Sequence, residues 1–405
     1  MLATDVSATG CLSSWVNGVA SAGTFIKSST ATWDINGVDG IPTGWIIKNE
    51  DGSYPQSAYL CFTSTGDSTV TMKQRGTPNT SAGKVLQYKL NNGQWQTWDL
   101  STVTLHDGDK MYVKSDDTIP MSESYSIYKN FVMTGSIAAS GNIMSLLNFS
   151  DTLTDYAFLS MFSGCTSLTQ APKLPVTTIK YGCYIDMFKG CTALTQAPAL
   201  PATTLADYCY RSMFERCTSL VQTPSILPAT TLKYYCYYNM FKGCTSLTNA
   251  PELPATTLAN GCYTGMFSGC SKLTQAPALP ATTLASDCYD SMFYDCTSLT
   301  QAPELPATTL ADYCYQLMFK GCSKLVQAPE LSATTLVNSC YYSMFENCTQ
   351  LNYIKALFTT TPNREYNYNW VSGVSSTGTF VKSKDATWNV TGANGIPAGW
   401  TVQTV

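Results

Sequence analysis

The chain has 405 residues, which is enough for two to four domains with a well-buried core. Hydrophobic residues make up 44% of it, so wholesale disorder is excluded. Charged residues make up only 12% and the net charge is −4, which leaves no basic stripe and argues against a nucleic-acid partner. No apolar run approaches the roughly 20 residues of a membrane span, so membrane insertion is not expected.

The surface composition and the first residues together predict where the protein works. Threonine, serine, asparagine, glutamine and tyrosine take the place of the usual charges, as in extracellular or virion-exposed proteins that meet sugars or other proteins. The N-terminus lacks both the basic and the apolar region of a signal peptide. We therefore expect an extracellular, bacterial cell-surface or virion location, for a chain made without a secretion signal or cut from a longer one.

Residues 1–47 are predicted to form a small Gly/Trp-rich module that recurs at 359–405. The segment from Trp15 to Trp45 matches the segment from Trp370 to Trp400 at a constant offset of 355 residues. The C-terminal copy is expected to cap a repeat array that ends just before it. The N-terminal copy has no repeats before it, so we expect the natural protein to be tandemly modular or this chain to be trimmed.

Residues 48–137 are predicted to be an all-β, sandwich-like domain. Short β-rich runs recur there about every ten residues. Asn92-Gly93 lies between two such runs and is a strong hairpin signal. The segment from Ser136 to Phe149 then leads into the next domain and is expected to cap its open end.

This β domain holds aromatic and acidic candidates for a ligand site. Tyr88, Trp95 and Trp98 could form a flat platform for a sugar, although alternation along one hairpin would turn some of them into the core. Asp107 and Asp109 could contact a calcium ion, but two acids in a turn usually mark only the turn. No metal site and no cofactor is expected, since the chain has no CxxC and a single histidine.

Residues 138–358 are predicted to form an α/β repeat solenoid of eight coils of about 26 residues, within the range of leucine-rich repeats. A Met-Phe pair recurs eight times, with a step of 26 residues six times and 27 once, at 161/162, 187/188, 213/214, 240/241, 266/267, 292/293, 318/319 and 344/345. In one copy Leu284, Cys288, Met292 and Cys296 are four apart, which predicts one face of a helix. A short extended segment over 297–302 should follow.

Stacked coils would align equivalent residues about 4.8 Å apart and give a rod of roughly 40 Å. One polar ladder on the predicted strand face consists of Gln170, Gln196, Gln222, Asn249, Gln275, Gln301 and Gln327. Two interpretations stay open for it. The amides could satisfy backbone groups as a structural ladder, or they could form a hydrogen-bonding surface for a ligand.

The chain has 17 cysteines, and 15 of them lie in the repeats. Most are paired eight residues apart, which is about 12 Å on a helix and too far for a disulfide. We therefore expect buried, free thiols that fill a narrow interior.

The repeated core Met161-Phe162-Ser163-Gly164-Cys165-Thr166-Ser167-Leu168 resembles the BspA-like leucine-rich repeats. These repeats occur in surface proteins of gut and oral bacteria and in proteins of phages that infect those bacteria. The resemblance covers about half of the chain. It implies a solenoid fold and a role in adhesion or attachment, through ligands on host cells, matrix or bacterial surfaces.

The sequence predicts no enzyme, because it has one histidine, His106, and no Walker, HExxH or dinucleotide-binding motif. The expected function is non-catalytic attachment to a cell-surface glycan or protein, as an adhesin or host-recognition protein. A receptor-binding component of a phage tail or fibre and a structural spacer remain alternatives. An oligomer is possible. The two residues between Cys-Tyr and Met-Phe differ in every copy. This variation is compatible with a surface of varied ligand contacts and equally with neutral sequence drift.

Overall fold

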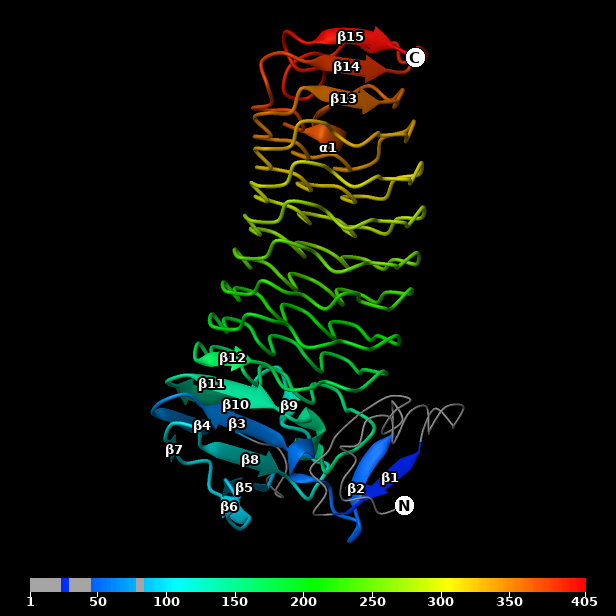
Figure 1. Ribbon diagram of the computed structural model, residues 1–405. Helices are drawn as coiled ribbons and strands as arrows, with labels where there is room; N and C mark the ends of the chain where they lie inside the picture. Colours follow the sequence, from blue (N-terminus) through cyan, green and yellow to red (C-terminus); the bar gives the residue numbers. More distant parts are fainter. Residues whose placement is uncertain (1–22, 29–44, 78–83) are drawn as a thin grey trace, which may run out of the picture.

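The computed structural model describes residues 23–28, 45–77 and 84–405. The described chain forms an elongated molecule with a β domain at one end and a long stack of coils that leads to the C-terminus at the other (Figure 1). We number the coils 1 to 8 by their Met-Phe pairs, from Met161-Phe162 to Met344-Phe345.

The β domain consists of two mainly antiparallel sheets. The four-stranded sheet has the order β7-β4-β10-β9, and the six-stranded sheet has the order β12-β11-β3-β8-β5-β6. The strands and the two 3-10 helices of this region are β3 (Leu60–Ser64), β4 (Ser68–Arg75), β5 (Leu86–Leu90), β6 (Gln96–Trp98), β7 (Val103–Leu105), β8 (Lys110–Lys114), β9 (Ser122–Ser124), β10 (Ile127–Thr134), β11 (Ile137–Ser140), η1 (Gln56–Ala58) and η2 (Ile143–Leu147).

The two sheets face each other across an aromatic core. Phe62 of β3 meets Phe131 of β10 edge-on, with ring centroids 4.9 Å apart, and Trp98 of β6 stacks on Phe131 at 6.2 Å. Inward and outward residues alternate along β4, as expected for strands with one buried face. The hairpin predicted at Asn92-Gly93 is confirmed, since β5 pairs with β6 in antiparallel fashion.

The β domain covers the open end of coil 1. Strand β12 (Leu168–Gln170) belongs to coil 1 and pairs in parallel with β11. In later coils the cysteine that follows Met-Phe donates to the carbonyl of the phenylalanine of the coil before it, as Cys191 does to Phe162. In coil 1 the thiol of Cys165 donates to the carbonyl of Phe131 at 3.1 Å. The Phe131 ring also stacks on Phe162 at 5.1 Å. Phe131 therefore takes the place that a preceding coil would fill.

The helix predicted in each coil is wrong. Backbone N–H groups in this segment alternate between two kinds of partner. The N–H of Met292 donates to the carbonyl of Tyr289, three residues earlier, at 3.2 Å, whereas that of Phe293 donates to the carbonyl of Met318 in the next coil at 2.9 Å. An α-helix would bond every N–H within its own segment. We call this segment the turn ribbon of the coil.

The backbone angles explain why the spacing of four suggested a helix. In coil 6, φ is 55° at Asp287, 54° at Ser291 and 56° at Asp295. A left-handed residue at every fourth position is incompatible with an α-helix, where φ is about −63°. A run of consecutive turns therefore produces the same four-residue period. Coil 5 carries the signal that sequence analysis missed, because Gly261 and Gly265 occupy the equivalent left-handed positions.

Aromatic ladders fill the interior of the coils. The phenylalanines of the eight Met-Phe pairs form one ladder. Their rings stack between neighbouring coils, with centroids 5.3 to 5.8 Å apart and planes within 8° of parallel. A second ladder consists of Tyr184, Tyr210, Tyr237, Tyr263, Tyr289, Tyr315 and Tyr341. These rings are almost completely buried, so most of the stabilising apolar contact lies between adjacent coils.

The expectation of free, buried thiols is confirmed for the repeats. All fifteen solenoid cysteines are buried and none forms a disulfide. The second cysteine of each pair donates to a carbonyl of the preceding coil, as Cys217 does to Phe188 at 3.0 Å. Burial raises the pKa of Cys217 to about 12 and that of Cys183 to about 12.

The buried thiols lead to a simple prediction. In the native protein, a chromogenic thiol reagent near pH 8 should react only slowly with the solenoid cysteines, because burial both blocks access and disfavours the thiolate. Denaturant without reductant should then expose all fifteen within the dead time of mixing. A denatured, unreduced sample that lacks a large share of these thiols would show that disulfides had formed.

Beyond β12 of coil 1, the predicted short strands are present in several coils as single parallel bridges. Gln196 pairs with Gln222, Gln275 with Gln301, and Gln327 with Tyr353. Only at the C-terminal end do these segments lengthen into a three-stranded parallel sheet of β13 (Tyr353–Ala356), β14 (Thr379–Lys382) and β15 (Thr401–Thr404).

The C-terminal module continues the solenoid before it closes it. The N–H of Phe345 in coil 8 donates to the carbonyl of Trp370 at 2.8 Å, the same bond that links coils 1 to 8. Trp370 is fully buried and follows the short helix α1 (Arg364–Asn367). The inter-coil bonding thus extends beyond the eight expected coils, into a segment that sequence analysis assigned wholly to a cap.

The duplicated module has the same strand pairing in both copies. β1 (Thr24–Lys27) pairs in parallel with β2 (Ile46–Asn49), as β14 does with β15. The start of β14 lies 355 residues after that of β1, and the start of β15 lies 355 residues after that of β2. Trp15 and most of the predicted module at 1–47 lie outside the described residues.

Candidate functional site

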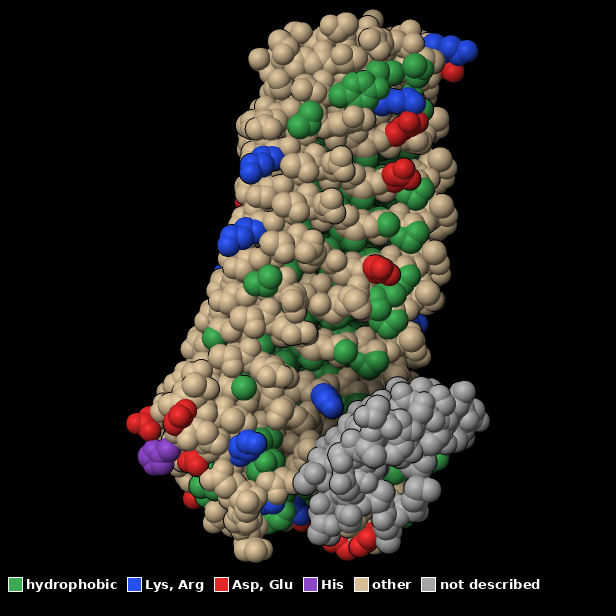
Figure 2. Space-filling view, viewed as in Figure 1, with side chains coloured by type: hydrophobic (Ala, Val, Ile, Leu, Met, Phe, Trp, Pro, Cys, Tyr) green, Lys and Arg blue, Asp and Glu red, His purple; other side chains and the backbone are tan. Residues whose placement is uncertain are grey.

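The amide ladder lies on the exposed strand face of the solenoid. All seven of its side chains are exposed, and parallel bridges join the backbones of Gln196 and Gln222 and those of Gln275 and Gln301. Figure 2 shows this face, which is largely uncharged, with a few acidic side chains along one edge of the coils. The described contacts include no bond from these amides to a backbone group; Asn249 donates instead to the hydroxyl of Thr248 at 3.2 Å. The amide groups of the ladder are therefore open to solvent.

A groove of about 730 Å³ lies beside the ladder at coils 6 and 7. Gln301 and Gln327 line it together with Pro303, Glu304 and Glu330. Proline cannot donate to a backbone ladder, so the chain turns away from the strand face at this point and leaves the hollow. The groove combines amide donors and acceptors, an Ala-Pro surface and two carboxylates.

The carboxylates of the groove differ in their surroundings. Glu304 and Glu330 occupy equivalent positions in neighbouring coils, which concentrates negative charge on one wall. Lys355 contacts Glu330 at 2.9 Å and partly offsets this charge. Both members of the pair are substantially exposed, so the pair contributes little to stability and can rearrange when a ligand enters.

The aromatic platform expected in the β domain does not form. Trp98 is 3% exposed and donates from Nε1 to the carbonyl of Ser101 at 2.9 Å, so it belongs to the core and is closed to a ligand. Trp95 packs against Tyr59 at 5.0 Å, and half-buried Tyr88 meets Trp98 at 6.0 Å. Side chains alternate along the hairpin, so Trp95 lies on the face opposite to Tyr88 and Trp98. The three rings therefore do not form one flat platform.

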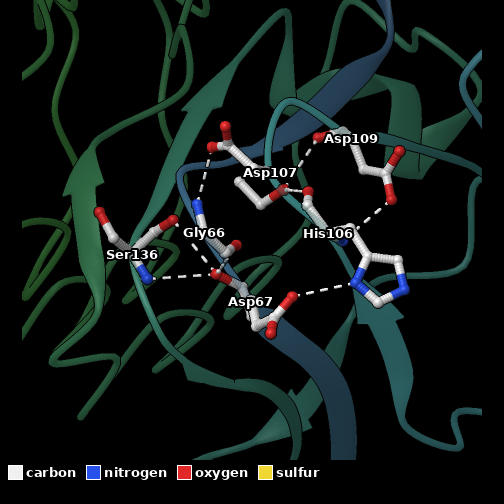
Figure 3. A network of polar contacts seen from close by, with 8 residues as sticks. Gly66, Asp67, His106, Asp107, Asp109 and Ser136 are labelled. Carbon is white, nitrogen blue, oxygen red and sulfur yellow. Dashed lines mark hydrogen bonds and ion pairs between the residues drawn. The ribbon is translucent and has the colours of Figure 1, made fainter.

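The acidic turn at residues 107–109 is a structural network. Figure 3 shows His106 directed toward Asp67, with its Nδ1 2.9 Å from a carboxylate oxygen. Asp107 accepts from the N–H of Gly66 and Asp109 from the N–H of His106, each at 2.9 Å. The hydrogen bond to Asp67, and then its charge, raise the pKa of His106. The carboxylates thus hold the turn before β8, as the simpler interpretation expected.

The described residues contain no group of three or more His, Cys, Asp or Glu side chains placed to hold a metal ion. Within the same part of the chain, no helix has the length and apolar character to cross a membrane.

Sequence analysis missed one cluster of side chains on the edge of coils 1 to 4. It contains Tyr156, Tyr181, Tyr208, Arg211, Tyr234, Tyr235 and Tyr238. Arg211 and Tyr238 belong to the variable pairs noted between Cys-Tyr and Met-Phe. The signal was the concentration of tyrosine just before Cys-Tyr in the early copies.

Comparison with known proteins addresses the repeats. The family described as BspA type leucine rich repeat region matches six copies over residues 237–370. Residues 237–370 thus carry BspA-type leucine-rich repeats. The matched residues include the buried Met-Phe, Cys and Leu positions of coils 4 to 8.

A solved leucine-rich repeat protein from Bacteroides ovatus is also similar to this chain. The two are 16% identical, and the match covers 72% of this chain and 95% of the other, with a TM-score of 0.23. No curated protein matches the chain.

Proposed function

We propose that this BspA-like protein is a non-catalytic attachment protein that binds a cell-surface glycan or protein through the strand face of its solenoid. The observation that carries the proposal is the ladder of exposed amides, one in each of seven coils, which borders the groove at Gln301 and Gln327.

The solenoid provides a rigid support for such a surface. The amides lie on short bridged segments whose opposite side faces the stacked aromatic interior, so binding costs little ordering of the backbone. Amide side chains both donate and accept, which suits the hydroxyls of a glycan and the backbone of an extended peptide alike. Placement on the surface of a cell or particle fits this role and the low charge of the face.

The groove gives a direct test of the proposal. The full chain is first screened against glycan arrays and against intact bacterial and host cells, and the dissociation constant of the bound ligand is then measured. Gln301→Ala combined with Gln327→Ala should weaken binding about tenfold or more, because two hydrogen-bonding groups are lost from a partly enclosed site.

The same ladder supplies a matched control. Gln196→Ala combined with Gln222→Ala removes two amides from coils 2 and 3, outside the groove, and should leave affinity within about twofold. Equal losses of affinity in both double variants would show that the binding site is not centred on the groove. Absence of binding to every surface would leave the structural spacer as the function, and binding to bacterial cells alone would favour the phage-type role.

A further inference from the structure

The tyrosine cluster on the edge of coils 1 to 4 forms a continuous line of aromatic rings. Tyr181 lies 5.5 Å from Tyr208 between ring centroids, and Tyr208 lies 5.3 Å from Tyr234. Tyr156 extends the line at one end and Tyr235 at the other. Tyr181 and Tyr234 are 36% and 39% exposed, so the line is open to solvent.

Specific contacts fix the positions of these rings. Asp207 in one coil accepts from the N–H of Tyr234 in the next at 3.1 Å, and Asp155 does the same for Tyr181 at 3.2 Å. A side chain at Gly261 would place its Cβ 2.3 Å from the ring of Tyr235. The carboxylates thus fix the backbone beneath the cluster, and Gly261 leaves the space that the ring of Tyr235 occupies.

Arg211 adds a cation to the line. Its guanidinium lies over the ring of Tyr208 at 5.9 Å and over that of Tyr238 at 5.4 Å from the centroids. Stacking on two rings limits the motion of a long side chain and leaves the edge of the guanidinium to donate hydrogen bonds. Partial burial, together with Tyr234, raises the pKa of Tyr235 to about 12, so its hydroxyl stays a donor at physiological pH.

The later coils do not repeat this arrangement. The two positions before each Cys-Tyr carry Asn260-Gly261 in coil 5 and Ser286-Asp287 in coil 6, and only Tyr313 in coil 7 is aromatic. Structural needs are the same in every coil, since all of them share one turn ribbon. The restriction to four consecutive coils therefore indicates a local role.

We propose that the tyrosine cluster is a binding site for an oligosaccharide chain, separate from the groove on the strand face. Pyranose rings present apolar C–H faces that stack on aromatic rings, and their hydroxyls can bond to the phenol groups and to Arg211. Successive coils repeat the aromatic ring along one axis, which suits a ligand that is itself a linear chain of rings.

The chemistry of the cluster favours a glycan over a protein partner. A stable protein interface buries about 1,000 Å² or more around an apolar core in which aromatic and aliphatic side chains fill pockets. This site is one line of phenol rings across four coils, with two exposed rings, Tyr181 and Tyr234, and no pocket-filling aliphatic side chain among its members.

The experiment uses the full chain and an array of neutral and acidic oligosaccharides, followed by calorimetry with the best-bound one. Tyr208→Ala combined with Tyr234→Ala should weaken binding about tenfold or more, because both rings lie in the middle of the line. Tyr234→Trp should keep affinity within about threefold, since a larger ring still stacks.

Two controls make the outcome decisive. Tyr313→Ala changes the residue equivalent to Tyr208 in a coil without the cluster and should have no effect on binding. Gln301→Ala with Gln327→Ala separates the two sites: a ligand at the cluster loses affinity only in the tyrosine double variant, whereas a ligand in the groove loses affinity only in the glutamine double variant. The proposal is overturned if no oligosaccharide binds, if the tyrosine double variant binds as well as the parent, or if only a protein ligand depends on these rings.

Discussion

Phe267→Ala in coil 5 is expected to lower the free energy of unfolding by about 3–5 kcal/mol. Phe267 is fully buried and stacks on Phe241 at 5.7 Å and on Phe293 at 5.8 Å, so truncation removes two ring contacts and leaves a cavity in the middle of the ladder. Each coil contacts mainly its neighbours, so the substitution should also weaken the link between the two halves of the solenoid.

Denaturant unfolding followed by circular dichroism and by tryptophan fluorescence would measure both effects. The variant should show a lower midpoint and transitions that no longer coincide for the two probes. Lys272→Ala in the same coil replaces an exposed side chain and should stay within about 0.5 kcal/mol of the parent. A loss below 1 kcal/mol for Phe267→Ala would mean that the neighbouring coils close the cavity.

Asp117→Asn in the β domain is expected to destabilise the protein by about 3 kcal/mol near neutral pH. The Nζ of Lys84 contacts a carboxylate oxygen of Asp117 at 2.7 Å, and the lysine side chain is 0% exposed. Burial lowers the pKa of Lys84, and Asp117 partly offsets this shift. Removal of the carboxylate would leave a buried ammonium ion without its counter-charge. The expected destabilisation lies at the low end of the range for breaking a buried ion pair, because Asp117 is partly exposed.

A second substitution separates charge from packing. Lys84→Met combined with Asp117→Asn removes both charges and should recover most of the lost stability, since a buried pair is often replaceable by apolar groups. Thermal unfolding of the single and double variants gives the comparison. Equal destabilisation of both would assign the loss to the hydrogen bond that Asp117 accepts from the N–H of Ile119.

The same pair predicts a pH dependence. Partial burial opposes ionisation of Asp117, but the hydrogen bond and charge of Lys84 outweigh it, and the pKa of Asp117 is lowered. Its contribution to stability is therefore present above the unfolded pKa of about 3.9 and is lost as the pH falls through the lower folded value. The parent should lose this contribution under acid, whereas Asp117→Asn should not.

The candidate sites differ in how far the sequence could predict them. The amides of the ladder recur once per coil, so the period alone placed them on one line and the structure only added that they are exposed. The tyrosine cluster gathers residues at three different repeat positions from four coils, and their meeting depends on how the turn ribbons stack. Trp98 was predicted as part of a ligand platform because the sequence shows that side chains alternate along a hairpin. It does not show which face of the hairpin the second sheet covers.

The sequence by itself determined the repeat, its period and the side chains that point inward, because apolar Cys, Met, Phe and Leu must be buried in every copy. Tertiary structure decided the backbone of the coil. A four-residue period fits an α-helix and a run of left-handed turns equally well, and the turn ribbon becomes stable only when half of its N–H groups reach carbonyls of the next coil, as from Phe293 to Met318. Those partners lie about 26 residues away, so the choice is made by stacking and not by local propensity.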